Sequence, residues 1–135
     1  MGTIVVYEDN SSDLIERYGF LTSSHDVHVY FLSTLYPCEL YPEVVLPYLK
    51  QAGFNLAQVH KELPTSPLEA DLFFVDGLSA APEGINCYAI LGQLPRDKAF
   101  LTSDGSTTRK VGRTQGFQTI HPGEISQVVE RILGS

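Results

Sequence analysis

Short apolar runs recur along the chain and are separated by segments with a different period. The runs are four to six residues long and rich in Val, Ile, Leu and Phe; they cover residues 4–7, 27–32, 71–75, 99–102 and 116–120. Continuous apolar runs of this length are typical of strands buried in a parallel sheet. Residues 54–60 alternate moderately between apolar and polar positions and predict one further strand.

The segments between these runs carry apolar residues at helical spacing. Helices are expected over residues 14–20, 42–52, 84–94 and 123–133, and a polar helix or loop over residues 106–115. Ser11, Ser12 and Asp13 are suitable N-cap residues, and Pro47 is expected to kink the second helix. Strand and helix thus alternate, which predicts one α/β domain over residues 1–135. The predicted sheet is mostly parallel, has five or six strands and carries helices on both faces, as in flavodoxin-like folds.

Charge and composition narrow the function. The 135 residues carry a formal charge of −7, and residues 1–90 hold twelve acidic against three basic side chains. A strongly acidic chain is a poor match for a protein that binds the nucleic-acid backbone, so a nucleic-acid partner is not expected. The sequence contains no long apolar stretch and no signal-peptide pattern, and it has two cysteines. We therefore expect a cytoplasmic protein without a membrane partner.

Acidic and hydroxyl residues follow several predicted strands. Glu8 and Asp9 end the first run, Asp76 ends the run at residues 71–75, and Thr102 ends the next. Ligands of open parallel sheets bind at the carboxyl ends of the strands. Converging carboxylates there favour a hard cation such as Mg²⁺, whereas isolated acids at strand ends are more often solvated turn residues. Both interpretations stay open for these residues.

Four segments, in order, resemble a response-regulator receiver domain. They read IVVYEDNSSDLIERY, DLFFVDGLSAAPEGI, AFLTS and GFQTIHPGEISQVVERIL, and the resemblance covers residues 3–20 and 42–133. It implies that Glu8, Asp9 and Asp76 hold Mg²⁺ and that Asp76 accepts a phosphoryl group. Thr102 would bind that phosphoryl group, and His121 stands where the family has a lysine.

The departures from the receiver pattern point to a divergent or pseudo-receiver. A histidine is shorter than lysine and mostly neutral at pH 7, so a phospho-switch at Asp76 would be weakened. Residues 21–41 have no counterpart and are expected to form an insert. The resemblance therefore implies a regulatory domain that acts by contact with a separate output or kinase protein, rather than an enzyme.

Two other interpretations remain open. The order of strands and acids is also similar to PIN-like and NYN-type nucleases, which hold Mg²⁺ or Mn²⁺ with several acids. That resemblance implies a site of Asp9 (or Glu8), Asp76 and Asp104, with Asn10 assisting. In this interpretation the basic residues Arg109, Lys110 and Arg113 are the candidate RNA contacts. The third interpretation is a non-catalytic interaction module that binds its partner through Tyr36, Tyr41 and Tyr48.

Overall fold

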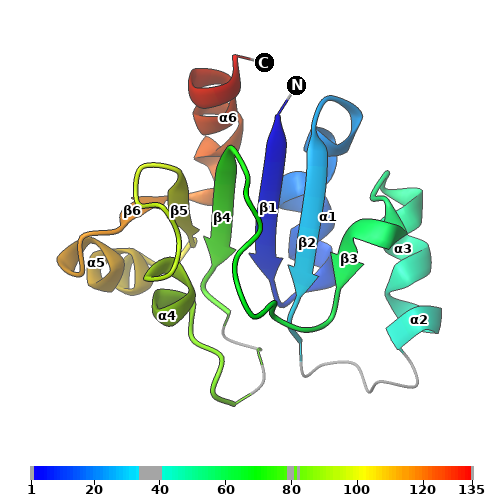
Figure 1. Cartoon of the computed structure of the whole chain (residues 1–135), viewed down its shortest axis with the longest axis horizontal. Helices are drawn as coiled ribbons and strands as arrows, with labels where there is room; N and C mark the ends of the chain where they lie inside the picture. Colours follow the sequence, from blue (N-terminus) through cyan, green and yellow to red (C-terminus); the bar gives the residue numbers. More distant parts are fainter. Residues whose placement is uncertain (1, 34–40, 79–80, 82, 135) are drawn as a thin grey trace.

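A six-stranded parallel sheet forms the centre of the molecule (Figure 1). The computed structural model describes residues 2–33, 41–78, 81 and 83–134. The strands are β1 Thr3–Glu8, β2 Asp26–Phe31, β3 Val59–His60, β4 Leu72–Asp76, β5 Ala99–Thr102 and β6 Gln118–Ile120. The helices are α1 Ser11–Tyr18, α2 Tyr41–Val44, α3 Leu46–Gln51, α4 Cys87–Leu91, α5 Ser106–Thr114 and α6 Ile125–Leu133. Short 3₁₀ turns cover Gly19–Ser23, Leu56–Gln58 and Pro122–Glu124.

The strand order is β3-β2-β1-β4-β5-β6, and every pair in it is parallel. The edge strand β3 has two residues; the five longer strands keep the 2-1-3-4-5 order of flavodoxin-like folds. The predicted α/β class and parallel sheet are therefore confirmed. The chain reverses direction across the sheet between β1 and β4, which is the position where such sheets bind ligands.

Two apolar cores lie on opposite faces of the sheet. The side chains of Val6 and Phe74 belong to the core that α1, α3 and α6 cover, together with Leu14, Leu49 and Val129. The side chains of Val5 and Phe73 belong to the other core, which α4 covers. Alternate residues of a strand point to opposite faces, so Glu8 and Asp76 belong to the face beneath α1.

Several predicted elements have different bounds in the structure. Helix α1 begins three residues earlier than expected, because Asn10 is its N-cap and its side chain accepts from the backbone N–H of Asp13. The helix expected over residues 42–52 is broken at Val45 into α2 and α3, which agrees with the kink predicted near Pro47. Only the last two residues of the predicted strand at 54–60 pair with the sheet.

Part of the segment interpreted as an insert, residues 21–41, belongs to the sheet. The strand predicted at residues 27–32 is confirmed as β2, which pairs with β1 along six residues, from Thr3 with Asp26 to Glu8 with Phe31. Residues 34–40 of the same segment lie outside the described residues. In the part of the chain that is described, no helix combines the length and the apolar character needed to cross a bilayer.

Neighbouring residues of α3 test the packing. Leu49 is fully buried, whereas Tyr48 is 61% exposed. Leu49→Ala should lower the free energy of unfolding by about 2–5 kcal/mol, because it leaves a cavity in the core beneath α3. Tyr48→Ala should change it by less than about 0.5 kcal/mol. Urea unfolding measures both, and equal effects would contradict the described orientation of α3.

Candidate functional site

Three carboxylates from different elements meet at the carboxyl edge of the sheet. Glu8 ends β1, Asp76 ends β4 and Asp13 lies in the first turn of α1. One carboxylate oxygen of each lies within 4.8 Å of the others. Tyr7 pairs with Val75 in the parallel register, so the next residue of each strand brings Glu8 beside Asp76. We call Glu8, Asp13 and Asp76 the acid group.

Glu8 is the deepest member of the acid group and has no exposed surface. Its Oε1 accepts from the backbone N–H groups of Asp9, at 3.0 Å, and Asn10, at 3.2 Å. These contacts hold the carboxyl group in the turn between β1 and α1. The other oxygen, Oε2, is buried and has no hydrogen-bond partner among the described residues.

Arg17 lies over the acid group from the last turn of α1. Its Nη1 donates to Oδ1 of Asp76 at 2.6 Å. Its Nη2 lies 3.7 Å from Asp13 and 3.8 Å from Asp104, which follows β5. One guanidinium group therefore faces three carboxylates, and its side chain is 14% exposed.

Buried polar atoms without partners gather beneath Arg17. Among the described residues, Oε2 of Glu8, the hydroxyl of Tyr18 and Oγ1 of Thr102 are the buried side-chain atoms that lack a hydrogen-bond partner. Tyr18 interacts electrostatically with Glu8 and Asp76 and faces the hydroxyl of Thr102, so these atoms are neighbours. Native proteins pair almost all such groups, and their convergence is typical of a place that holds water or an ion.

Burial and mutual repulsion change the protonation of the acid group. Burial raises the pKa of Glu8 far above its usual range, and the Asp76 carboxylate raises it further. Burial also raises the pKa of Asp76, although contacts with Glu8 and Arg17 oppose the rise. Desolvation and the nearby Glu8 and Asp76 raise the pKa of Tyr18. The raised pKa of Glu8 favours its neutral form in the ion-free protein at pH 7.

The residues expected from the sequence are only partly brought together. Glu8 and Asp76 are joined, while Asp9 is buried beside Glu8 without belonging to the acid group. Thr102 pairs with Asp76 across β4 and β5 and is fully buried. Asp104 is connected to the acid group by its ion pair with Arg17.

The proposed basic residues serve structural contacts. His121 is exposed, and its Nδ1 accepts from the backbone N–H of Gly123 at 3.1 Å, so its ring caps the turn before α6. Arg109 donates to the carbonyl oxygen of Ser103 at 2.6 Å, and Arg113 donates to Thr119 at 3.2 Å. Asn10 caps α1 rather than facing the acid group.

Sequence reasoning missed Asp13 and Arg17 as site residues. Asp13 was interpreted as a capping residue, and Arg17 was counted as one of three bases. Their spacing of four residues places both on one face of a helix that directly follows the acidic strand end. This spacing, read together with the acidic end of the preceding strand, could have indicated both residues as site residues.

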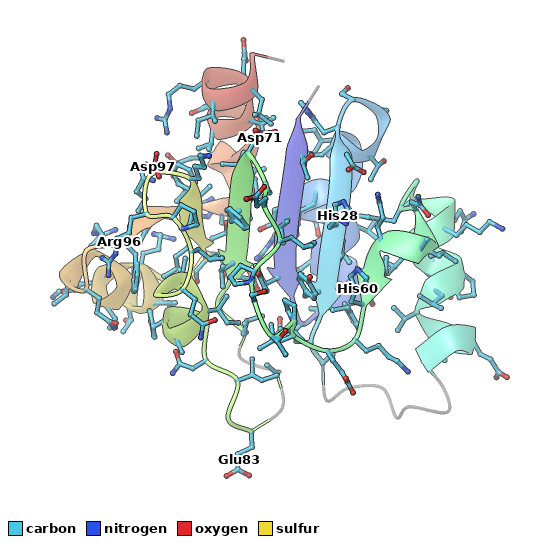
Figure 2. The ribbon with its side chains drawn as sticks, viewed as in Figure 1. His28, His60, Asp71, Glu83, Arg96 and Asp97 are labelled. Atoms are coloured by element: carbon cyan, nitrogen blue, oxygen red, sulfur yellow. The ribbon has the colours of Figure 1, made fainter. Side chains whose placement is uncertain are left out.

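An open groove adjoins the acid group. It has a volume of about 520 Å³, and its lining includes Asp13, Arg17, Phe20, Asp104 and His121. The groove gives Arg17 and Asp104 access to solvent. Other acids lie elsewhere: Asp71 and Asp97 are at the opposite end of the sheet, and Glu83 is at a loop tip (Figure 2).

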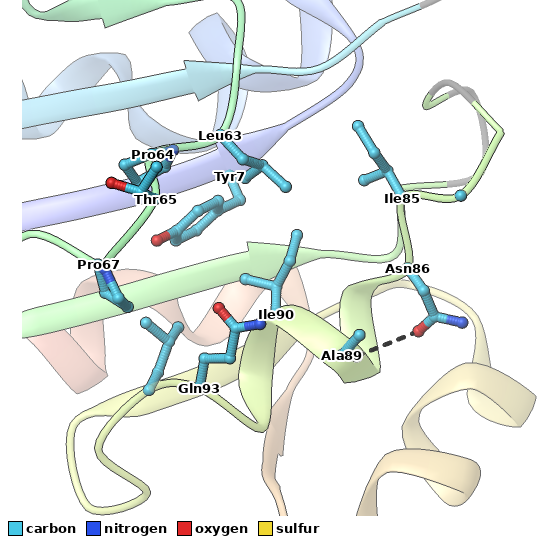
Figure 3. A pocket seen from close by; sticks show the side chains of 12 residues that line it. Tyr7, Leu63, Pro64, Thr65, Pro67, Ile85, Asn86, Ala89, Ile90 and Gln93 are labelled. Carbon is cyan, nitrogen blue, oxygen red and sulfur yellow. Dashed lines mark hydrogen bonds between the residues drawn. The ribbon is translucent and has the colours of Figure 1, made fainter.

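A second pocket lies on the other face of the sheet. Its volume is about 270 Å³, and it is bounded by Tyr7, the loop at residues 63–67 and α4 (Figure 3). Its lining contains no charged side chain. This pocket is therefore separate from the carboxylate chemistry.

The tyrosines of the interaction interpretation are only partly described. Tyr36 lies outside the described residues, and for Tyr41 only the backbone is described, at the start of α2. Tyr48 is an exposed residue of α3. A role of these tyrosines in partner binding stays a prediction.

Comparison of the sequence with models of known families and with curated proteins finds no match. Among solved structures, one described as a "putative flavoprotein" from Bacteroides eggerthii is similar, with a TM-score of 0.42 and 14% sequence identity. The alignment covers 98% of this chain and 99% of that chain. A likeness this distant carries no argument about function, so the site is interpreted from its own geometry.

The neutral state of Glu8 predicts a pH dependence of stability. Folding raises the pKa of the Glu8 carboxyl above its value in the unfolded chain, near 4.5. The contribution of this group to the stability of the folded protein is therefore fully present below pH 4.5 and is lost as the pH rises. The free energy of unfolding of the ion-free protein should fall by roughly 1 kcal/mol per pH unit between about pH 5 and pH 8. Glu8→Gln should flatten this slope, because the amide stays neutral.

Thermal unfolding in EDTA across this pH range measures the slope. Glu83→Gln is the matched control, because Glu83 is exposed at a loop tip (Figure 2). A Glu8→Gln protein that keeps the wild-type slope would contradict the neutral state of Glu8.

Proposed function

We propose that this chain is a divalent-cation-dependent domain that hydrolyses phosphodiesters, with Glu8, Asp13 and Asp76 as the cation ligands. The observation that carries the proposal is the buried Oε2 of Glu8, which has no partner among the described residues and belongs to three converging carboxylates. Carboxylate oxygens are the ligands that Mg²⁺ and Mn²⁺ prefer. The donor set therefore fits a hard divalent cation.

Each side chain has a distinct role in this proposal. Glu8 supplies a ligand fixed by two backbone N–H groups, and Asp76 supplies a second from the neighbouring strand. Asp13 completes the set from α1, on the side that opens to the groove. A bound divalent cation supplies an activated water molecule at neutral pH and neutralises charge on the phosphate. Asp104, with a side chain 72% exposed, lies where substrate would enter.

The geometry favours hydrolysis over transfer of a phosphoryl group to Asp76. A phosphoryl acceptor must present a carboxylate oxygen to the phosphodonor, whereas Asp76 is 7% exposed and faces Glu8 and Asp13. The hydroxyl of Thr102 is buried beside Tyr18. In the ion-free protein the His121 ring caps the turn before α6, with Nδ1 accepting from the backbone N–H of Gly123.

A receiver-like switch is the second candidate function. The observation that favours it is the direct pairing of Asp76 with Thr102 on adjacent strands, with Glu8 on the strand at the other side of β4. In this function a phosphoryl group on Asp76 would alter the surface seen by a separate protein partner. The site residues are shared, so the two functions differ in their chemistry and not in their location.

Cation binding tests the proposal most directly. Titration calorimetry with Mn²⁺ should give saturable binding to the wild-type protein and a release of protons, because Glu8 must ionise to become a ligand. Asp76→Asn should weaken binding by about 10–100-fold. Asp97→Asn is the control: Asp97 is exposed at the opposite end of the sheet, and its variant should bind as the wild type does (Figure 2).

Hydrolysis is measured with bis(p-nitrophenyl) phosphate and a labelled single-stranded RNA in Mn²⁺. We expect cleavage by the wild type and a loss of about a hundredfold or more in Asp76→Asn. Absence of Mn²⁺ binding by the wild type would refute the cation site. Mn²⁺ binding without hydrolysis, with amide shifts at Thr102 on addition of beryllofluoride, would overturn the hydrolase in favour of the receiver-like switch.

A further inference from the structure

We infer that Arg17 is a built-in counter-ion that competes with the divalent cation for Asp76 and Asp13 and turns into the adjoining groove when the cation binds. This inference rests on the proposed function and adds the residue that regulates the site. It also gives Arg17 a second ligand, a phosphate oxygen of the substrate.

The contacts of Arg17 place its charge where a cation would bind. Its Nη1 is 2.6 Å from Oδ1 of Asp76, and its Nη2 is 3.7 Å from Asp13. Both acids belong to the group whose oxygens lie within 4.8 Å of one another. A guanidinium and a divalent cation cannot share these oxygens at short distance, because both are positive and each repels the other.

The ion-free protein needs a positive charge at this place. Asp76 is buried, and a buried carboxylate without a compensating charge is strongly unfavourable. Nη2 also lies 3.8 Å from Asp104, so one guanidinium compensates three carboxylates in part. The guanidinium is always protonated, and its planar fork suits several carboxylates at once.

The structure provides a place for the displaced side chain. Arg17 lines the open groove of about 520 Å³, together with Phe20, Asp104 and His121. Its backbone can stay within α1 while the flexible side chain rotates toward the groove. There the guanidinium would offer paired N–H donors to a phosphate, a geometry in which arginine binds anions strongly.

The exchange has a consequence for the order of binding. The groove lining includes the acids Asp13, Glu16 and Asp104, which repel a phosphodiester while Arg17 is held by Asp76. Entry of the cation neutralises the acid group and releases Arg17 at the same time. Substrate binding should therefore require the cation to bind first.

Mn²⁺ titration of Arg17→Ala, followed by calorimetry, tests the competition. The variant should bind Mn²⁺ about tenfold more tightly than the wild type, because it lacks the competing charge. Arg17→Lys, which keeps the charge and loses the fork, should bind with an affinity closer to the wild type. Arg109→Ala is the control, because Arg109 donates a hydrogen bond to the Ser103 carbonyl oxygen. The Mn²⁺ affinity of this variant should equal that of the wild type.

Kinetics at saturating Mn²⁺ test whether Arg17 binds the phosphate of the substrate. For bis(p-nitrophenyl) phosphate, Arg17→Ala should raise KM by about tenfold with a smaller change in kcat, because phosphate binding loses its arginine. A purely structural role would not produce tighter metal binding together with weaker substrate binding. Thermal unfolding in EDTA and in Mn²⁺ reports whether each variant is folded.

The outcomes separate this inference from the proposed function. Mn²⁺ binding by the wild type with equal or weaker binding by Arg17→Ala overturns the exchange and leaves the cation site. If Arg17→Ala does not fold, Arg17→Lys decides: it keeps the competing charge but loses the paired N–H donors, so its KM should rise, and an unchanged KM overturns the exchange. Binding by neither the wild type nor the variants overturns both proposals.

Discussion

The proximity of two carboxyl groups at the ends of β1 and β4 is the constraint on which the rest of the site depends. The parallel register places Glu8 beside Asp76 in a buried position, where two negative charges would cost several kcal/mol. The protein compensates this cost in three ways. The raised pKa of Glu8 favours its neutral form, two backbone N–H groups donate to its Oε1, and Arg17 pairs with Asp76.

Helix α1 joins the fold to the site. One face of α1 packs Leu14 into the apolar core, while Asp13 and Arg17 extend over the strand ends. Its N-cap, Asn10, lies in the same short turn that binds Glu8. A change in the position of α1 would therefore alter the core and the acid group together. Through this coupling, a cation bound at the proposed site would affect the stability of the fold as well.

The receiver and nuclease resemblances share Asp76 and the acidic end of the first strand, but they make different demands on the site. The receiver resemblance implies Asp76 as a phosphoryl acceptor; in the ion-free protein Asp76 pairs with Arg17, and His121 caps a turn. The proposed hydrolase would use the acids Asp13 and Asp104 and the groove beside them. Whether Arg17 stays on Asp76 or leaves it when a cation is added distinguishes a fixed structural ion pair from a site that binds ligands.

The sequence alone determined the α/β class, most strands and helices, the break near Pro47 and the acids at the ends of β1 and β4. These features follow from local periodicity, capping and the polarity of strand ends, which are written in consecutive residues. Tertiary structure decided that the strand predicted at residues 27–32 pairs with β1, that Asp13 joins Glu8 and Asp76, and that Arg17 pairs across the site. The tertiary structure also shows that His121 caps the turn before α6. Strand order and register bring residues 59 positions apart into contact, as for Arg17 and Asp76, and no local pattern encodes that pairing.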